Sequence, residues 1–164
     1  MLSVRQVSKR EFKELVGRLS ETGITCRISK SKKIIAVKSK HGELFIADEK
    51  PLLVYLNDGT ILPFIGSLNF FNGLKKVYVD EGAAPYVTNG ADVMRPGIKE
   101  YDEFNEGDIV AVFILNYNTP IALGKALVSS EALSSMKKGK VVKNLHYASD
   151  EFWKIAVGRG FKPG

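Results

Sequence analysis

The sequence is poor in the residues that hold metals or form disulfides. Its 164 residues include one cysteine, Cys26, and two histidines, His41 and His146. A single cysteine excludes an internal disulfide framework and is typical of a reducing compartment, so we expect a cytoplasmic protein. Three such side chains cannot complete a usual zinc site without carboxylates. We therefore predict no metal site.

Long hydrophobic runs and known catalytic motifs are also missing. No apolar stretch approaches the length needed to cross a bilayer, and residues 1–5 open no secretory signal, so we expect no membrane partner. There is no Walker-type phosphate loop, nucleophile elbow or dinucleotide fingerprint. The prediction is a protein that is not an enzyme, with no catalytic residues and no cofactor.

The net positive charge of the chain is concentrated in its first half. Residues 1–75 contain 13 basic and 7 acidic side chains, whereas the remainder contains 11 of each. An acidic block follows at 100–108. A local positive field attracts polyanions, but a solvated lysine-rich surface explains the same composition, and charge alone leaves both readings open. The two basic clusters are Arg27, Lys30, Lys32, Lys33, Lys38 and Lys40, and then Lys137, Lys138, Lys140 and Lys143.

The first part of the chain predicts a helix packed on a small antiparallel sheet. Ser8 and Glu11 form a capping-box pattern, and apolar residues follow at helical spacing up to Gly23. Strand-length apolar runs then alternate with turn residues, and the Asn-Asp-Gly sequence at 57–59 predicts a hairpin. We expect an α+β fold whose N-terminal domain spans residues 1–74.

The second part predicts a β-barrel over residues 75–156, followed by a basic tail at 157–164. Apolar runs at 109–115 and 121–128 flank a turn and form a hairpin, and 140–146 is a further strand. Phe152 and Trp153 are expected to close the end of this barrel; an exposed Trp153 would instead be able to stack on a base.

The segment 77–98 combines small residues with turn signals. A short strand ends at Asp80, a small-residue helix runs to Asn89 and Gly90, and Arg95 precedes a Pro-Gly turn. Because glycine and alanine carry almost no side chain, another backbone can come close to such a surface. The pattern favours a docking surface for a polyanion over a catalytic centre.

Several ordered blocks of the second part resemble the PUA domain. They are 79–83 (Val-Asp-Glu-Gly-Ala), 90–98 (Gly-Ala-Asp-Val-Met-Arg-Pro-Gly-Ile), 107–112 (Gly-Asp-Ile-Val-Ala-Val), 122–126 (Ala-Leu-Gly-Lys-Ala) and 139–147 (Gly-Lys-Val-Val-Lys-Asn-Leu-His-Tyr). With Asp150 and Trp153, the last block is similar to the malignant T-cell-amplified-sequence family and its archaeal relatives. The resemblance covers residues 76–153 closely and the first 75 residues more loosely.

This resemblance implies RNA binding in translation or RNA modification, without catalysis by this chain. The expected partners are a transfer RNA end or ribosomal RNA, the small ribosomal subunit, and a protein partner. Arg95 is the main expected RNA contact, because its guanidinium can bind a phosphate through two hydrogen bonds or stack on a base. Arg95→Ala is expected to weaken binding more than loss of one lysine from 137–143. The implied RNA-binding residues are Gly82, Ala83, Gly90, Ala91, Val93, Met94, Arg95, Pro96, Gly97 and Lys125, with Lys140 and Lys143 widening the positive field.

A different function remains open from the residues alone. The alternative is a protein-interaction adaptor whose N-terminal domain recruits a translation-factor partner or an RNA-modifying enzyme. In that function, RNA contact is secondary. For His146, a structural role is expected, because no nucleophile or metal partner accompanies it in the sequence.

Overall fold

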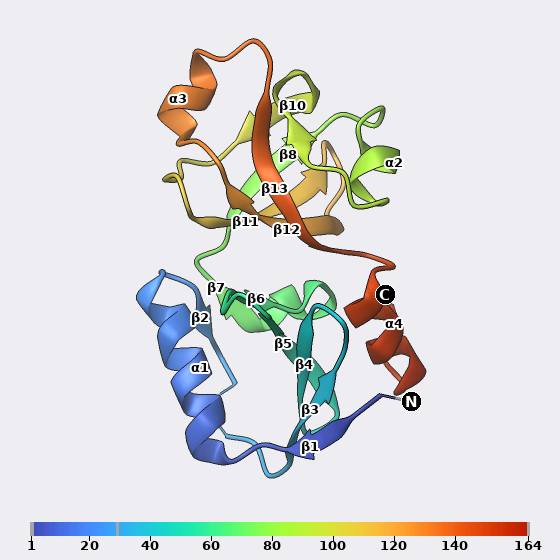
Figure 1. Ribbon diagram of the computed structural model, residues 1–164. Helices are drawn as coiled ribbons and strands as arrows, with labels where there is room; N and C mark the ends of the chain where they lie inside the picture. Colours follow the sequence, from blue (N-terminus) through green and yellow to red (C-terminus); the bar gives the residue numbers. More distant parts are fainter. Residues whose placement is uncertain (1, 29, 164) are drawn as a thin grey trace. The chain divides into compact units, whose positions relative to one another are not determined.

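A computed structural model describes residues 2–28 and 30–163, which form two compact units (Figure 1). The first unit combines residues 1–73 with 151–164, and the second unit comprises residues 74–150. This division differs from the sequence prediction at its C-terminal end. The segment expected to finish the barrel, 151–156, and residues 157–163 of the expected tail, 157–164, belong to the first unit; Gly164 lies outside the described residues.

The first unit contains a capped helix and an antiparallel sheet. Helix α1 (Lys9–Glu21) begins where the Ser8 hydroxyl accepts a hydrogen bond from the Glu11 amide at 3.0 Å, and it buries Phe12, Leu15 and Leu19. The sheet has the strand order β1-β3-β4-β5-β6, and β2 pairs separately with β7. The strands are β1 (Val4–Gln6), β2 (Thr25–Cys26), β3 (Ile34–Lys38), β4 (Gly42–Ala47), β5 (Lys50–Leu56), β6 (Ile61–Pro63) and β7 (Phe71–Asn72). The hairpin at 57–59 joins β5 to β6, as predicted.

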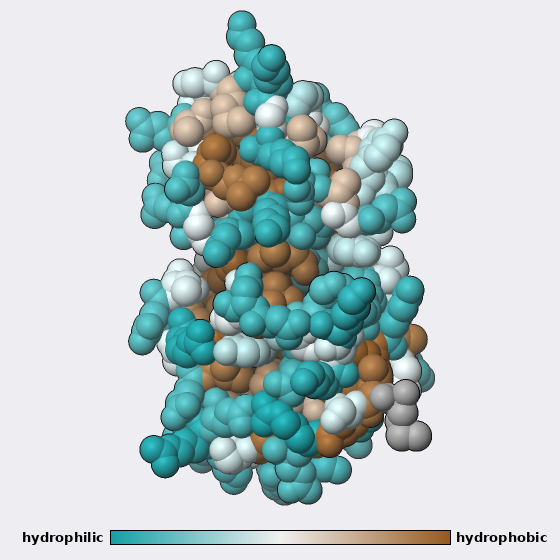
Figure 2. Space-filling view, in the orientation of Figure 1, coloured by the Kyte–Doolittle hydropathy of each residue, from teal (hydrophilic) through white to brown (hydrophobic). Residues whose placement is uncertain are grey.

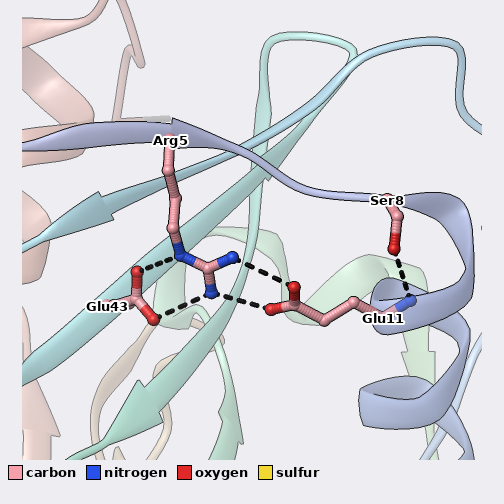
Figure 3. A network of polar contacts seen from close by, with 4 residues as sticks. All are labelled: Arg5, Ser8, Glu11 and Glu43. Carbon is pink, nitrogen blue, oxygen red and sulfur yellow. Dashed lines mark hydrogen bonds and ion pairs between the residues drawn. The ribbon is translucent and has the colours of Figure 1, made fainter.

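An arginine ties three of these elements together (Figure 3). Arg5 on β1 donates hydrogen bonds to both carboxylate oxygens of Glu11 on α1, at 3.0 and 2.7 Å, and to both of Glu43 on β4, at 2.9 and 3.1 Å. These hydrogen bonds from Arg5 lower the pKa of Glu11 below its ordinary value. The edge strand is thereby fixed to the helix and to the sheet interior.

The C-terminal helix α4 (Glu151–Gly158) packs beside β4 in the first unit. Trp153 stacks on Phe64 with ring centroids 6.1 Å apart, and Phe161 meets both rings edge-on at 5.4 and 5.2 Å. Phe64 immediately precedes the 3₁₀ helix η1 (Ile65–Phe70). The expectation that Trp153 and Phe152 close the barrel end is therefore wrong: α4 carries both residues into the first unit.

The second unit is a six-stranded sheet in the order β10-β8-β11-β12-β13-β9. Strands β8 and β11 run parallel and the other neighbours antiparallel. Its elements are β8 (Lys75–Val79), α2 (Ala84–Val87), β9 (Val93–Met94), η2 (Arg95–Gly97), β10 (Ile98–Tyr101), β11 (Ile109–Ile114), β12 (Pro120–Ala126), α3 (Ser130–Ser134) and β13 (Lys140–Tyr147). The hairpin of β11 with β12 and the strand β13 confirm the sequence prediction.

This sheet is an open half-barrel rather than a closed barrel. Among the described residues, β9 and β10 each pair on one side only, and η2 carries the chain directly from one of these edges to the other. A cluster of buried aliphatic residues, including Val77, Val110 and Val142, fills the interior. The fold therefore places α2, β9 and η2 next to one another at the sheet edge, where the small-residue segment lies.

Hydrophilic side chains cover most of the visible face of each unit (Figure 2). Within the described ranges, no helix is both long and apolar enough to cross a membrane.

Candidate nucleic-acid interface

A carboxylate turn positions helix α2 at the end of β8. The Asp80 carboxylate accepts a hydrogen bond from the Ala83 amide at 2.8 Å, and the Asp80 amide donates to the carbonyl of Gly97 at 2.9 Å. Asp80 therefore starts the turn into α2 and also attaches it to η2. Side chains of this kind form such local bonds because their oxygen lies within reach of nearby backbone amides.

Glycine lets this region pack closely. Gly90 follows α2 with φ of +95°, and a β-carbon there would lie 3.1 Å from the Tyr147 ring. A β-carbon at Gly97 would approach that of Ala83 to 3.0 Å. The helix stop at Asn89-Gly90 is thus as predicted, and the small residues at 83 and 97 allow α2 and η2 to approach each other.

A pocket of about 460 Å³ lies between α2, β9 and η2, with β13 at its rim. Its volume is within the range of sites that hold small ligands or single groups of larger ones. Two large side chains at its edge project into solvent, because Tyr86 is 70% exposed and Met94 is 45% exposed. The pocket is lined by Gly82, Ala83, Tyr86, Val87, Ala91, Asp92, Val93, Met94, Gly97 and Lys140.

The structure brings together seven of the twelve residues that the sequence singled out. Gly82, Ala83, Ala91, Val93, Met94, Gly97 and Lys140 line the pocket. The remaining five, Gly90, Arg95, Pro96, Lys125 and Lys143, are outside its lining. Sequence reasoning missed Tyr86, Val87 and Asp92. An aromatic residue beside a proline on a glycine-flanked helix was the available signal for Tyr86.

Arg95 is engaged in holding the fold together. Its side chain donates from Nε to the carbonyl of Met136 at 3.1 Å and from one terminal nitrogen to the carbonyl of Ile98 at 3.2 Å. Its amide donates to the carbonyl of Gly139 at 2.8 Å. Because the guanidinium carries five N–H donors, it retains donors for a ligand. The geometry assigns Arg95 a structural role, while phosphate binding by this residue stays a prediction.

A polar network fixes β13 against the pocket. The Lys140 ammonium is 3.2 Å from the Asp92 carboxylate, whose other oxygen accepts a hydrogen bond from the Asn144 amide at 2.9 Å. The Asn144 side chain donates to the carbonyls of Val87 and Ala91 at 2.9 and 3.0 Å. Asn144 thereby orients both the end of α2 and the segment before β9. The ion pair with Asp92 holds Lys140 at the rim of the pocket.

Two exposed lysines stand side by side on neighbouring strands of the same sheet. Lys125 on β12 and Lys143 on β13 are paired in register. Like charges directly opposite each other on a sheet are destabilising. An anion bound between the two ammonium groups would offset this repulsion.

The buried histidine has a local structural partner. His146 is fully buried, and its Nδ1 lies 2.6 Å from the Asp150 carboxylate, which also accepts a hydrogen bond from the Tyr147 amide at 3.0 Å. The contact joins the end of β13 to the turn that follows it. In the part of the chain that the structure describes, no group of three or more His, Cys, Asp or Glu side chains could hold a metal ion.

Comparison with known proteins identifies the second unit. The PUA domain family matches residues 75–148. The uncharacterized protein MJ1432 of Methanocaldococcus jannaschii is 38% identical over 112 residues, which cover 68% of this chain and 69% of that protein. Translation machinery-associated protein 20 of Saccharomyces cerevisiae is 27% identical over 137 residues, covering 73% of this chain and 75% of that protein.

A solved structure matches almost the whole chain. The crystal structure of a PUA domain protein, APE0525 from Aeropyrum pernix K1, in a tartrate complex, superposes with a TM-score of 0.82 at 30% identity. The match covers 98% of this chain and 94% of that one, so both units have counterparts there. The extent of these matches, together with the half-barrel and its glycine-flanked α2, shows that the chain belongs to the PUA-domain proteins, alongside the archaeal protein MJ1432 and translation machinery-associated protein 20.

Proposed function

We propose that this protein binds structured RNA, a transfer RNA end or ribosomal RNA, and acts without catalysis in translation initiation or recycling, or in RNA modification. Two findings support the proposal. The chain carries a PUA domain, an RNA-binding fold, and one relative that aligns over most of its length is a translation machinery-associated protein. The small ribosomal subunit is a partner that fits this role.

The pocket beside α2 is the observation that carries the proposal. Single-stranded RNA is recognised largely by stacking its bases on aromatic side chains and by contacts to its backbone. Tyr86 offers an exposed ring, and the small residues Gly82, Ala83, Ala91 and Gly97 line the pocket beside it. A nucleotide at an RNA end can therefore lie in the pocket against this ring.

Positively charged side chains next to the pocket can bind the phosphates of the same RNA strand. Lys140 lies at the rim, and the paired lysines Lys125 and Lys143 stand farther along β12 and β13. Phosphate contacts position a nucleic acid without reading its sequence, whereas contacts to the bases discriminate. We assign the lysines the first task and the pocket the second.

Crosslinking to total cellular RNA tests the proposal. The full-length protein is irradiated in cells and the bound RNA is sequenced, with a lysine-rich protein of similar net charge as the control. Enrichment of transfer RNA acceptor ends or of a defined ribosomal RNA site is the expected result. The same RNA profile for both proteins would overturn the proposal.

An exposed apolar edge favours a second candidate function, that of a protein-interaction adaptor. β1 lies at the edge of the first unit's sheet, and Leu2 and Val4 are 50% and 48% exposed there. An edge strand with exposed apolar side chains on it and next to it can recruit another protein, here a translation factor or an RNA-modifying enzyme. Apolar contacts survive salt that strips RNA. A defined protein retained in a high-salt pulldown by the wild type, and lost with Val4→Lys, supports this role.

A further inference from the structure

The net positive charge of this protein lies in the unit outside the PUA half-barrel. The first unit contains 15 Lys and Arg against 8 Asp and Glu, a net charge of +7. The second unit contains 9 against 10, a net charge of −1. Attraction of a polyanion over distance depends on local positive fields. The second unit as a whole carries no net positive charge, so its attraction depends on a few local lysines, and the first unit supplies the larger positive field.

A basic cleft in the first unit concentrates part of that charge. It has a volume of about 540 Å³ and lies between α1 and the segment that leads into β3. Phe12 and Ile34, both buried, contribute its apolar surface, and the lysine side chains around them are exposed. The cleft is lined by Lys9, Phe12, Lys13, Lys30, Ser31, Lys32, Ile34 and Asp48.

Two lysines of α1, Lys9 and Lys13, occupy positions that are electrostatically unfavourable within an isolated helix. Lys9 is the first residue of the helix, at the positive end of the helix dipole, where cations are disfavoured. Lys13 lies one turn further on, and like charges at this spacing repel each other. Across residues 2–28 and 30–163, neither Lys9 nor Lys13 forms an ion pair, and the same holds for Lys30 and Lys32. A bound anion would relieve this repulsion.

Asp48 is the one carboxylate among the lining residues, and it fixes the opposite wall. Its oxygens accept hydrogen bonds from the amide of Lys32, at 3.0 Å for each oxygen, and from the amide of Lys33 at 2.9 Å. These backbone hydrogen bonds lower the pKa of Asp48 below its ordinary value. The carboxylate therefore anchors the segment that carries Lys30 and Lys32, and the residues that line the cleft include four lysines and one carboxylate.

We infer that the cleft between α1 and residues 30–34 binds phosphate groups of the RNA backbone, as a second contact separate from the PUA pocket. The inference rests on the proposed function, because the RNA that occupies the pocket supplies the backbone. An acidic protein segment has the same charge. RNA is favoured because the same chain carries an RNA-binding fold whose own net charge is negative.

Salt dependence of RNA binding provides the test. The affinity of the full-length protein for a fluorescent single-stranded RNA is measured by anisotropy between 50 and 300 mM KCl, as a working range around physiological ionic strength. Each phosphate contact to a single strand contributes about −0.7 to the slope of log affinity against log salt. Lys9→Gln with Lys13→Gln is expected to reduce the slope by about 1.4, twice that contribution.

A matched control removes the same charge from the same unit. Lys38 and Lys154 are exposed and lie outside the cleft, so Lys38→Gln with Lys154→Gln tests the general field alone. Circular dichroism confirms that each variant folds. If the α1 variant unfolds, Lys30→Gln with Lys32→Gln tests the opposite wall, with the same expected change in slope.

The outcomes separate this inference from the proposed function. If the slope changes equally in the cleft and control variants, the cleft is not an RNA contact, whereas the proposal that the protein binds RNA is unaffected. Binding of fluorescent polyglutamate, a model of an acidic protein segment, is measured in the same way. If the cleft variant loses polyglutamate binding while its RNA binding matches that of the control, the cleft binds an acidic protein and the inference is overturned. Absence of RNA binding by the wild type would overturn both proposals. A selective fall of the slope in the cleft variant supports the RNA contact.

Discussion

Replacement of Tyr86 by alanine removes the exposed ring at the mouth of the PUA pocket. Tyr86 is 70% exposed, and the short helix α2 that carries it is anchored through other residues, so the fold is expected to persist. Stacking of one base on an aromatic side chain contributes about 1–3 kcal/mol. This corresponds to a loss of affinity of roughly 5- to 150-fold for RNA with a single-stranded end.

Two variants make this measurement specific. Tyr86→Phe keeps the stacking ring and is expected to bind within about twofold of the wild type, less than the smallest loss expected from removing a stacked base. Tyr117→Ala removes another exposed tyrosine of the same unit, 53% exposed and outside the pocket, and is expected to bind like the wild type. The affinities are measured by anisotropy at fixed salt. Unchanged affinity for Tyr86→Ala, or an equal loss for Tyr117→Ala, would refute the stacking role.

Two further predictions concern the fold. Arg95→Ala is expected to lower the free energy of unfolding in urea by about 1–3 kcal/mol, because the carbonyls of Met136 and Ile98 lose a charged donor; unchanged stability would contradict the structural role of Arg95. Arg5 lowers the pKa of Glu11, so the stability from this pair is present above the pKa of Glu11 in the unfolded chain and is lost as the pH falls through its lower folded value. The free energy of unfolding of the wild type is therefore expected to exceed that of Glu11→Gln at neutral pH, and this difference is expected to shrink in acid. A difference that stays constant with pH would argue against a contribution of the Arg5–Glu11 pair to stability.

Local patterns account for the parts of the fold that the sequence predicted. The Ser8 cap, the 57–59 hairpin and the stop at Gly90 each depend on residues within a few positions of one another, and each is found in the structure. Such features follow from backbone geometry and local hydrogen bonds. The α2 segment and most of its pocket could therefore be anticipated.

Contacts between distant residues account for what was missed. Trp153 packs on Phe64, some ninety positions earlier, so no local pattern assigns α4 to the first unit. Arg95 bonds to Met136, forty-one positions later, which gives a surface arginine a role inside the fold. The basic cleft likewise lies between a helix face and a loop. Counting charges along the sequence identified the basic cluster, but it could not show that these residues line a cleft.

The central claim is that RNA lies in the pocket between α2, β9 and η2. Ultraviolet crosslinking of the full-length protein to RNA, followed by mass spectrometry of the crosslinked peptides, tests it most directly. Crosslinks are expected at Tyr86 and in the 91–97 segment. The Tyr86→Ala variant is expected to lose the crosslink at residue 86, and the Tyr117→Ala variant is expected to retain all of them. Crosslinks confined to the first unit, with none in the segment 82–97, would contradict it.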